Sequence, residues 1–197
     1  MKLNRLTIIL CGATLLSLNT KAQKIELLEG DLSFLRHEKH IVTQFTYDSM
    51  RVGKFDREED YINYRRDTLN KLHPGKGDKW AQEWVSDRKK RFEPDFNEMF
   101  DDNSKMTTAS QATYTLIFKT RFTEPGFETG TFVQHMAEIR GEAWIVETAN
   151  PAHVLAKMSI AHSSQFGMMG SFDTGKRLAQ AYGEVGEAVA LFIRKKD

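Results

Sequence analysis

The sequence predicts an α+β or α/β fold in two layers, a mixed sheet of about four strands with helices packed on one face. Two kinds of apolar periodicity predict it. Apolar residues alternate at a period of two, as in strands with one buried face, along 40–48, 114–123, 135–148 and 154–162. They recur at helical spacing along 56–72, 78–93, 94–100 and 173–193. The expected order is β-α-α-β-β-β-α, because one helical layer against one sheet buries both kinds of apolar face.

Residues 1–22 have the pattern of an export signal. Two basic residues give a positive start, an apolar run follows at 6–18, and Ala22 is the small residue before a cleavage point at Gln23. As a helix this run rises only about 20 Å, against a hydrocarbon core of about 30 Å, so a retained membrane span is not expected. We therefore expect a signal peptide at 1–22 and a single α/β domain at 23–197.

The single cysteine, Cys11, lies inside this expected signal. Leu10 precedes it where a lipid-anchored protein needs a small residue, so lipid anchoring is not expected. Cleavage leaves a mature chain without cysteine, which excludes thiol catalysis and disulfides. Cleavage also removes three of the 28 basic residues and none of the 27 acidic ones, so the formal charge changes from +1 to −2. A nucleic-acid binder driven by bulk charge is therefore excluded.

The helices of the N-terminal half have clear start and stop signals. Asp56 lies three residues before Glu59, which predicts a cap for the first helix, and the Pro-Gly pair within 73–77 ends it. The second helix is expected to begin near Asp78. Pro94 lacks a backbone N–H and predicts a break or kink just before it.

The C-terminal half is predicted to contain three strands and a long helix. In the first of these strands we expect Tyr114, Leu116, Phe118 and Phe122 to face inward. We expect Thr115, Lys119, Arg121 and Thr123 to face outward. Asp173 is expected to cap the last helix, which carries a ridge of small residues suited to packing flat on the sheet: Gly175, Ala179 and Gly183.

Motifs for phosphate binding and nucleophilic catalysis are weak. Residues 170–176 match the phosphate-loop pattern G-x-x-x-x-G-K. However, Arg177 stands where that loop needs Ser or Thr, and Asp173 would bring a negative charge into the phosphate cradle. A capped helix start is the expected structure instead. The chain also lacks the G-x-S-x-G elbow of serine hydrolases.

Four histidines, His37, His40, His135 and His153, are the candidate ligands of a metal site. They lack the H-x-x-x-H spacing of helical zinc sites, so no metal or other cofactor is expected. His162 continues an apolar strand face and is expected to be a hydrogen-bonded core residue.

The candidate binding residues are aromatic side chains and turn residues. Trp80 and Trp84 are one helical turn apart, a spacing typical of core packing and also of a surface on which ligands stack. Glu124 and Phe127 belong to a turn at 124–130. Phe166 belongs to a glycine-containing loop at 163–171. We expect these three segments to be the contact surfaces.

Distinctive stretches run through nearly all of the mature chain: EGDLSFL, YDSMRVGKFDREEDYI, KWAQEW, YTLIFKTRFTEPGF and FDTGKRLAQAYGEVGEAVALFI. In these stretches the chain resembles a family of exported bacterial proteins of unknown function. Its element order is similar to the small α/β domain of TolB N-termini and of curli-export-type envelope lipoproteins. That second resemblance implies a binding or assembly role in the envelope rather than catalysis.

We therefore expect an exported, non-catalytic protein, periplasmic or released, that binds an envelope protein or another cell-surface component. Two alternatives stay open. One is a small secreted metal-dependent hydrolase that uses the histidines. The other is a small-ligand carrier with an aromatic pocket.

Overall fold

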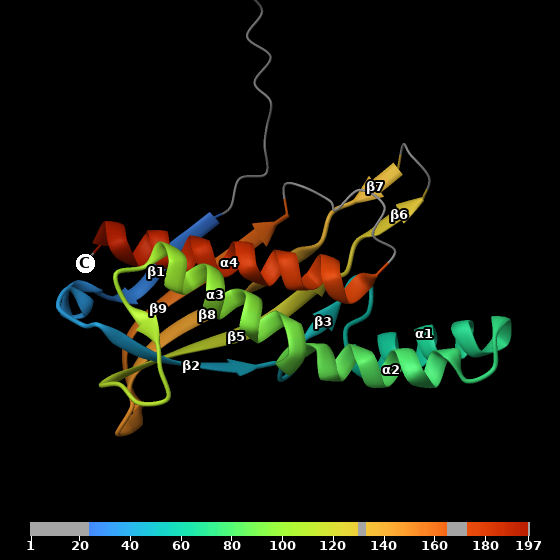
Figure 1. Ribbon diagram of the computed structural model, residues 1–197, viewed down its shortest axis with the longest axis horizontal. Coiled ribbons are helices and arrows are strands. Elements are labelled where there is room, and N and C mark those ends of the chain that lie inside the picture. Colours follow the sequence, from blue (N-terminus) through green and yellow to red (C-terminus); the bar gives the residue numbers. More distant parts are fainter. Residues whose placement is uncertain (1–23, 130–132, 165–172, 197) are drawn as a thin grey trace, which may run out of the picture.

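A computed structural model describes residues 24–129, 133–164 and 173–196 of the chain (Figure 1). The expected signal peptide with its cleavage point lies outside these residues, and so does Phe166. The described part is a mixed sheet with helices on one face, which confirms the predicted α+β class.

The sheet has seven strands, more than the four predicted, in the order β1-β9-β8-β5-β2-β4, and β3 also pairs with β5. Its strands are β1 (Lys24–Gly30), β2 (His40–Thr46), β3 (Arg51–Val52), β4 (Thr107–Thr108), β5 (Tyr114–Glu124), β8 (Glu138–Glu147) and β9 (Asn150–Ser163). A separate hairpin joins β6 (Phe127–Thr129) to β7 (Val133–His135). The strand predicted at 135–148 is thus divided, because its first residue belongs to this hairpin.

Strand directions divide the sheet into two parts. The pairs β1–β9, β9–β8 and β8–β5 are antiparallel. The pairs β5–β2, β2–β4 and β5–β3 are parallel. Because β2 and β3 pair with successive parts of β5, β3 continues the line of β2 after a short turn in which Ser49 has a positive φ of 58°.

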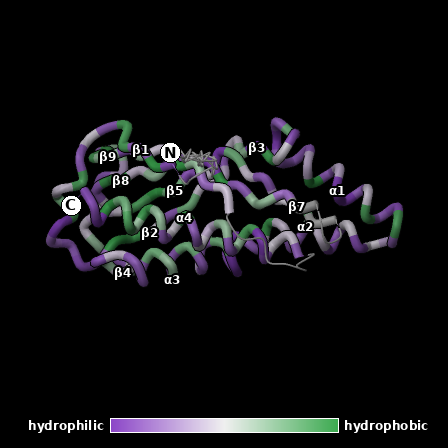
Figure 2. Tube along the Cα trace, turned by 90° about the horizontal axis from the view of Figure 1, so that it is seen from above, coloured by the Kyte–Doolittle hydropathy of each residue, from purple (hydrophilic) through white to green (hydrophobic). Residues whose placement is uncertain are grey.

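The helices are α1 (Glu58–Leu72), α2 (Lys76–Asp87), α3 (Glu93–Asn103) and α4 (Thr174–Lys196), with a short 3-10 turn η1 (Ser33–Leu35) before β2. Helices α3 and α4 lie side by side across one face of the sheet, whereas α1 and α2 form a hairpin that projects beyond the sheet (Figure 1). Hydrophilic and hydrophobic residues alternate along this hairpin (Figure 2), and α1 has no fully buried residue.

One prediction about a helix end is wrong. The first helix begins at Glu58 with Arg57 at the N-cap position and no side-chain cap, and Asp56 forms an ion pair with Arg51 at 3.0 Å. The regular α-helix is interrupted before Pro94, as predicted, although the chain stays helical there. A single π-helical turn, η2 (Arg88–Phe92), joins α2 to α3, and Pro94 lies in the first turn of α3.

The core lies between the sheet and the α3–α4 layer. Phe96, Phe118 and Tyr182 are fully buried, and ring centroids are 5.5 Å apart for Phe96 and Phe118. The Tyr182 hydroxyl is 2.9 Å from the Thr120 hydroxyl, so its polar end is satisfied inside the core. Each fully buried aromatic side chain of this kind contributes about 1.5–3 kcal/mol to the stability of the fold through burial alone.

The predicted faces of β5 are wrong at three positions. A bulge between Thr120 and Phe122 shifts the register against β8, so the alternation reverses beyond it. Thr123, predicted outward, is only 2% exposed. Phe122, predicted inward, instead has the Arg140 guanidinium 4.6 Å from its ring centroid on the other face of the sheet. Thr115, also predicted outward, is buried and hydrogen-bonds a neighbouring threonine.

The prediction that the small-residue ridge of α4 packs on the sheet is wrong, because its glycines face other helices. A Cβ atom at Gly175 would meet the Asp87 carboxylate of α2, and one at Gly183 would lie 3.2 Å from Met99 of α3. The larger side chains of α4 face the sheet. Its small residues face the neighbouring helices, because small residues let two helices approach each other closely. None of the helices in the described ranges has the length and apolar character that crossing a bilayer requires.

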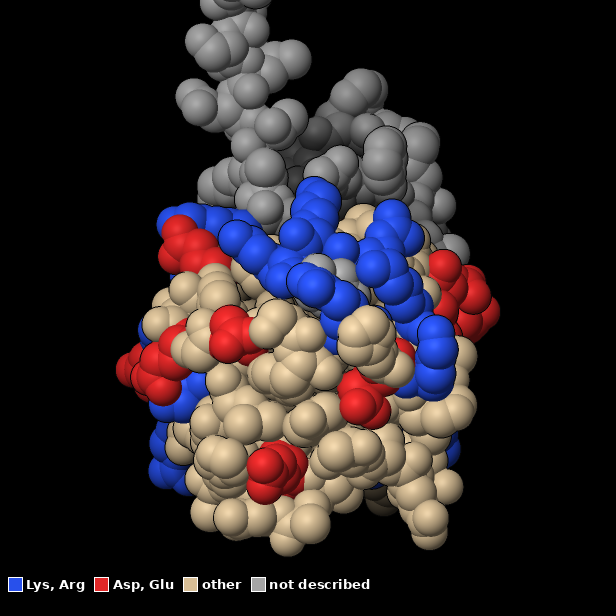
Figure 3. Space-filling model, turned by 90° about the vertical axis from the view of Figure 1, so that its left-hand side faces the viewer, with Lys and Arg blue, Asp and Glu red and all other residues tan. Residues whose placement is uncertain are grey.

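Two further surfaces lie away from the core. On the sheet face opposite α3 and α4, Trp144 has Lys119 Nζ 3.0 Å and Lys157 Nζ 4.8 Å from its ring. At the end of the molecule where α4 finishes, lysines and arginines gather (Figure 3). The last turn of α4 contributes Arg194, Lys195 and Lys196 to that end.

His162 is buried and hydrogen-bonded, as predicted, and its partner makes stability depend on pH. Glu184 lies 2.6 Å from His162 Nε2 and accepts hydrogen bonds from Ser164 and Gln180. Burial raises the pKa of Glu184, but these hydrogen bonds outweigh it and hold the pKa below the usual value of 4.5. The carboxylate therefore stabilises the fold above about pH 4.5, and this contribution disappears as the pH falls through the lowered folded-state pKa.

We expect Glu184→Gln to lower the free energy of unfolding by about 1.5 kcal/mol at neutral pH, through lost charge-assisted hydrogen bonds. Urea unfolding of both proteins between about pH 3 and pH 7 measures the difference. It should shrink as the pH falls, and a difference that is constant with pH would contradict the assignment.

Candidate functional site

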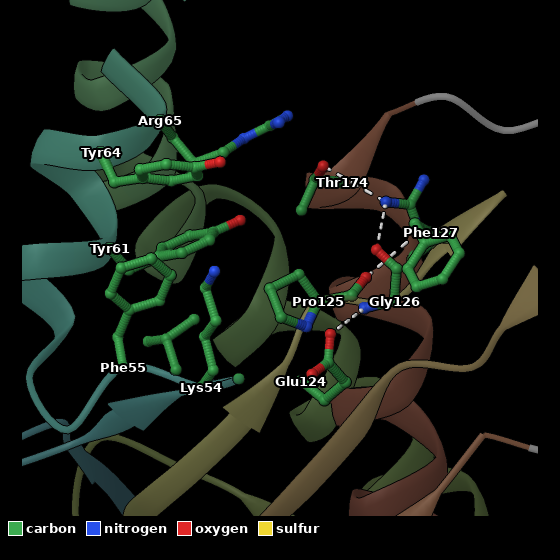
Figure 4. Close-up of a pocket in the computed structure, with 13 residues that line it drawn as sticks. Lys54, Phe55, Tyr61, Tyr64, Arg65, Glu124, Pro125, Gly126, Phe127 and Thr174 are labelled. Carbon is green, nitrogen blue, oxygen red and sulfur yellow. Dashed lines mark hydrogen bonds between the residues drawn. The ribbon is translucent and has the colours of Figure 1, made fainter. Parts of the chain in front are cut away.

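A cleft of about 720 Å³ opens where the α1–α2 hairpin meets the end of the sheet. One wall is α1 with the turn that follows β3, and the other is the segment at 124–127 with the first turn of α4 (Figure 4). Three segments that are distant in the sequence, 52–65, 124–127 and 174–177, therefore build this cleft.

Aromatic rings form the α1 wall. Tyr61 and Tyr64 are three residues apart and so lie on one face of the helix. Phe55 packs against both, with ring centroids 5.7 Å and 5.4 Å away. Burial raises the pKa of Tyr61 to about 12, with Arg65 acting in the opposite direction. The Tyr61 hydroxyl is therefore protonated near neutral pH and acts as a neutral hydrogen-bonding group.

The opposite wall is held in place by Arg177 of α4. Its guanidinium donates hydrogen bonds to the carbonyls of Pro125 and Gly126 at 3.2 Å and 3.1 Å, and to the Thr174 hydroxyl at 3.3 Å. Gly126 has a φ of 65°, and a Cβ there would lie 2.3 Å from a carbonyl oxygen of the next hairpin, so this position requires glycine. Phe127 then projects from this wall and is 48% exposed.

A second recess of about 480 Å³ adjoins the first and shares Arg65 and Thr174 with it. Trp80 and Trp84 line it, and both pack against Tyr61. Trp80 is half-buried, whereas Trp84 is only 5% exposed. The two recesses together make one groove with aromatic side chains along its length.

Trp84 is fixed by a partly buried ion pair at the base of the hairpin. Its indole N–H donates to Glu58 at 2.6 Å, and Arg88 donates to both oxygens of the same carboxylate at 2.5 Å. The side chains of Glu58 and Arg88 are 18% and 20% exposed. This ion pair ties the first turn of α1 to the π-helical turn after α2.

Positive charge in the two recesses is balanced in different ways. In the second recess Arg91 forms ion pairs with Asp87 and Asp173 at 3.2 Å and 2.9 Å. In the first recess, no carboxylate among the described residues lies in ion-pair range of Lys54 or Arg65. Lys54 Nζ instead lies 5.5 Å from two aromatic rings, and the Arg65 guanidinium lies 5.7 Å from the Trp80 ring.

The structure brings together four of the five predicted binding residues. Glu124 and Phe127 line the first recess, and Trp80 and Trp84 line the second. Phe166 lies outside the described residues. Sequence reasoning missed the lining residues of α1 and of the turn before it, which are Lys54, Phe55, Tyr61, Tyr64 and Arg65. The spacing of the three aromatic residues among them was a usable signal.

The predicted metal ligands lie at separate places. His37 follows η1, His40 is 3.0 Å from a threonine hydroxyl of β4, and His135 stacks on Phe127 with centroids 5.6 Å apart. His153 pairs with a glutamate of β8 at 3.1 Å. Within the described ranges, no three His, Cys, Asp or Glu residues are grouped so that they could hold a metal ion.

Comparison with known proteins gives distant likenesses to solved structures. No family model and no curated protein matches the chain. Among solved structures, the PelC dodecamer from Paraburkholderia phytofirmans is similar, at 11% identity and a TM-score of 0.39, over 86% of this chain and 98% of that one. Protein XCC0632 from Xanthomonas campestris, of the DUF330 family, is similar at 14% identity and a TM-score of 0.43, over 81% of this chain and 87% of that one.

Proposed function

We propose that this chain is an exported, non-catalytic protein of the cell envelope that binds another envelope component through the groove between α1 and the 124–127 segment. The observation that supports this most is that exposed aromatic rings stand on both walls of the first recess. The α1 wall adds two cations, Lys54 and Arg65, that form no ion pair with a described carboxylate. Tyrosine, tryptophan and arginine are the residues that dominate binding surfaces, because they combine apolar area with hydrogen-bonding groups. Export itself predicts a mature chain that begins at Gln23.

The lining of the first recess favours binding over hydrolysis. Its described residues include no histidine, serine or cysteine, and Tyr61 keeps its proton near neutral pH. The recess thus offers hydrogen-bond donors and apolar surface but no nucleophile activated by a neighbouring base.

Site-specific photo-cross-linking in intact cells tests the proposed function. A benzophenone amino acid placed at Tyr64 or Phe127, which are 51% and 48% exposed on facing walls, should give one discrete adduct with an envelope component. Matched controls at Leu28 and Leu72, which are 53% and 68% exposed outside the groove, should not give it. Monomer alone from all four positions, or the same adducts from groove and control positions, would contradict the proposal.

A small-ligand carrier is a second candidate function. The volume of about 720 Å³ supports it, since small-molecule sites typically measure about 300–1,000 Å³. The carrier function predicts that a small molecule co-purifies with the protein, which native mass spectrometry of the exported chain measures. A mass equal to that of residues 23–197 alone would count against it.

A further inference from the structure

We propose that the first recess binds an oxyanion carried on a flat aromatic group, with the Arg65 guanidinium as its anchor and Lys54 as a second cation. This inference rests on the proposed binding function and adds to it the chemistry of the group that is bound. On an envelope partner the group would be a carboxylate, phosphate or sulfate next to an aromatic ring.

The first argument is the state of Arg65. Its Nε atom is buried and has no hydrogen-bond partner, and no ion pair engages its guanidinium among the residues that the structure describes. The side chain leaves α1 one turn after Tyr61 and points into the space facing Thr174 (Figure 4). The guanidinium lines the recess without a described carboxylate partner, so a ligand oxygen that accepts from its N–H groups would compensate its charge.

The second argument is the contrast with other arginines around the hairpin. Arg88 is bound by Glu58, Arg91 by Asp87 and Asp173, and Arg177 by backbone carbonyls. Each of these is committed to holding the fold together. Arg65 lies among them, yet the described structure gives it no such partner.

The third argument is the charge of the recess itself. Lys54 is at the tip of the tight turn between β3 and α1, on the same wall as Arg65. Glu124 is the one carboxylate among the described lining residues, and its Oε1 already accepts the Gly126 N–H at 3.1 Å. Cations therefore outnumber the acid, and the recess is complementary to an anion.

The fourth argument concerns the body that carries the anion. Tyr64 and Phe127 are large aromatic side chains that are about half exposed on facing walls. Phe127 is already stacked on His135, with an interplanar angle of 14°. A flat ring placed between the walls would cover both side chains while its charged substituent reaches Arg65.

Three probes separate the two parts of this recognition. The fluorescent dye 1-anilinonaphthalene-8-sulfonate has both the rings and the anion, N-phenyl-1-naphthylamine has the rings alone, and inorganic phosphate has the anion alone. We expect the sulfonate dye to bind the mature protein roughly ten-fold more tightly than the neutral dye. Phosphate should displace it only at far higher concentration.

Variants then assign the anchor. Arg65→Gln should raise the Kd of the sulfonate dye about ten-fold and change that of the neutral dye less than about two-fold. Lys54→Gln, at an exposed turn, should raise the Kd of the sulfonate dye about three-fold without affecting folding. Arg66→Gln is the matched control, because Arg66 is the next residue of α1 and pairs outside the groove with Asp67 at 3.0 Å. It should leave both affinities unchanged.

The outcomes are distinguishable from those of the proposed function. Equal affinity for the two dyes, or equal effects of Arg65→Gln and Arg66→Gln, would overturn the anion anchor. Because cross-linking at the groove is measured independently of either dye, it could still succeed in that case, and the binding function would survive without this chemistry.

Discussion

Gly186→Ala is expected to lower the free energy of unfolding by about 3 kcal/mol, because overpacking a core contact costs about 1–3 kcal/mol and occasionally more. A Cβ atom at this position would lie 2.2 Å from the backbone oxygen of Phe96. The oxygen belongs to α3 and cannot rotate away, so α3 and α4 would have to separate over the fully buried Phe96 ring. Urea unfolding measures the loss.

Gly183→Ala is the matched control, one turn earlier on the same helix. Its new Cβ would lie 3.2 Å from the side chain of Met99, which is flexible, and 3.5 Å from the nearest backbone oxygen. Alanine is favoured over glycine in a helix interior by about 1 kcal/mol, so this variant should be as stable as the natural protein or slightly more stable. Equal destabilisation by the two substitutions would refute the close α3–α4 packing.

Arg88→Met is expected to lower the free energy of unfolding by about 3 kcal/mol, which is the second large effect. The substitution keeps most of the side-chain volume but leaves the partly buried Glu58 carboxylate with the Trp84 indole as its one remaining side-chain partner among the described residues. Removing one partner from a fully buried ion pair costs about 3–5 kcal/mol, because the other charge is left uncompensated, and a partly buried pair lies at the low end of that range. Since this pair ties α1 to α2, the groove should also lose affinity for its ligand.

A double-mutant cycle separates the ion pair from general damage. Glu58→Gln removes the charge that Arg88→Met strands, so the double variant should be more stable than the sum of the two single losses predicts. We expect a coupling of about 1–3 kcal/mol in thermal or urea unfolding. Strictly additive losses would mean that the two side chains act independently.

The long elements could be predicted because their periodicity extends over many residues. Strands β2, β5 and β9 and helix α4 lie where alternation or helical spacing placed them. Strands β3 and β4 have two residues each, too few to show a period, and the alternation of β1 is interrupted by a register shift near its end. The bulge in β5 could not be predicted either, because it depends on pairing with β8.

The candidate site was predictable only in part, for a related reason. Trp80, Trp84, Glu124 and Phe127 were selected on aromatic spacing and turn chemistry, and their role in binding stays a prediction. The charged residues of α1 look like a solvated helix face in the sequence. Arg65 differs from Arg88 and Arg177 in having no partner that the tertiary fold supplies among the described residues, and no local pattern contains that information.

The most direct test of the groove as an anion-binding site is a ¹⁵N–¹H correlation spectrum of the mature protein, recorded with and without 1-anilinonaphthalene-8-sulfonate. The largest shifts should fall on the Arg65 Nε–H and on the backbone amides of Lys54, Tyr64 and Gly126, which surround the first recess. Shifts concentrated on the sheet face around Trp144, with the Arg65 Nε–H signal unmoved, would contradict the account.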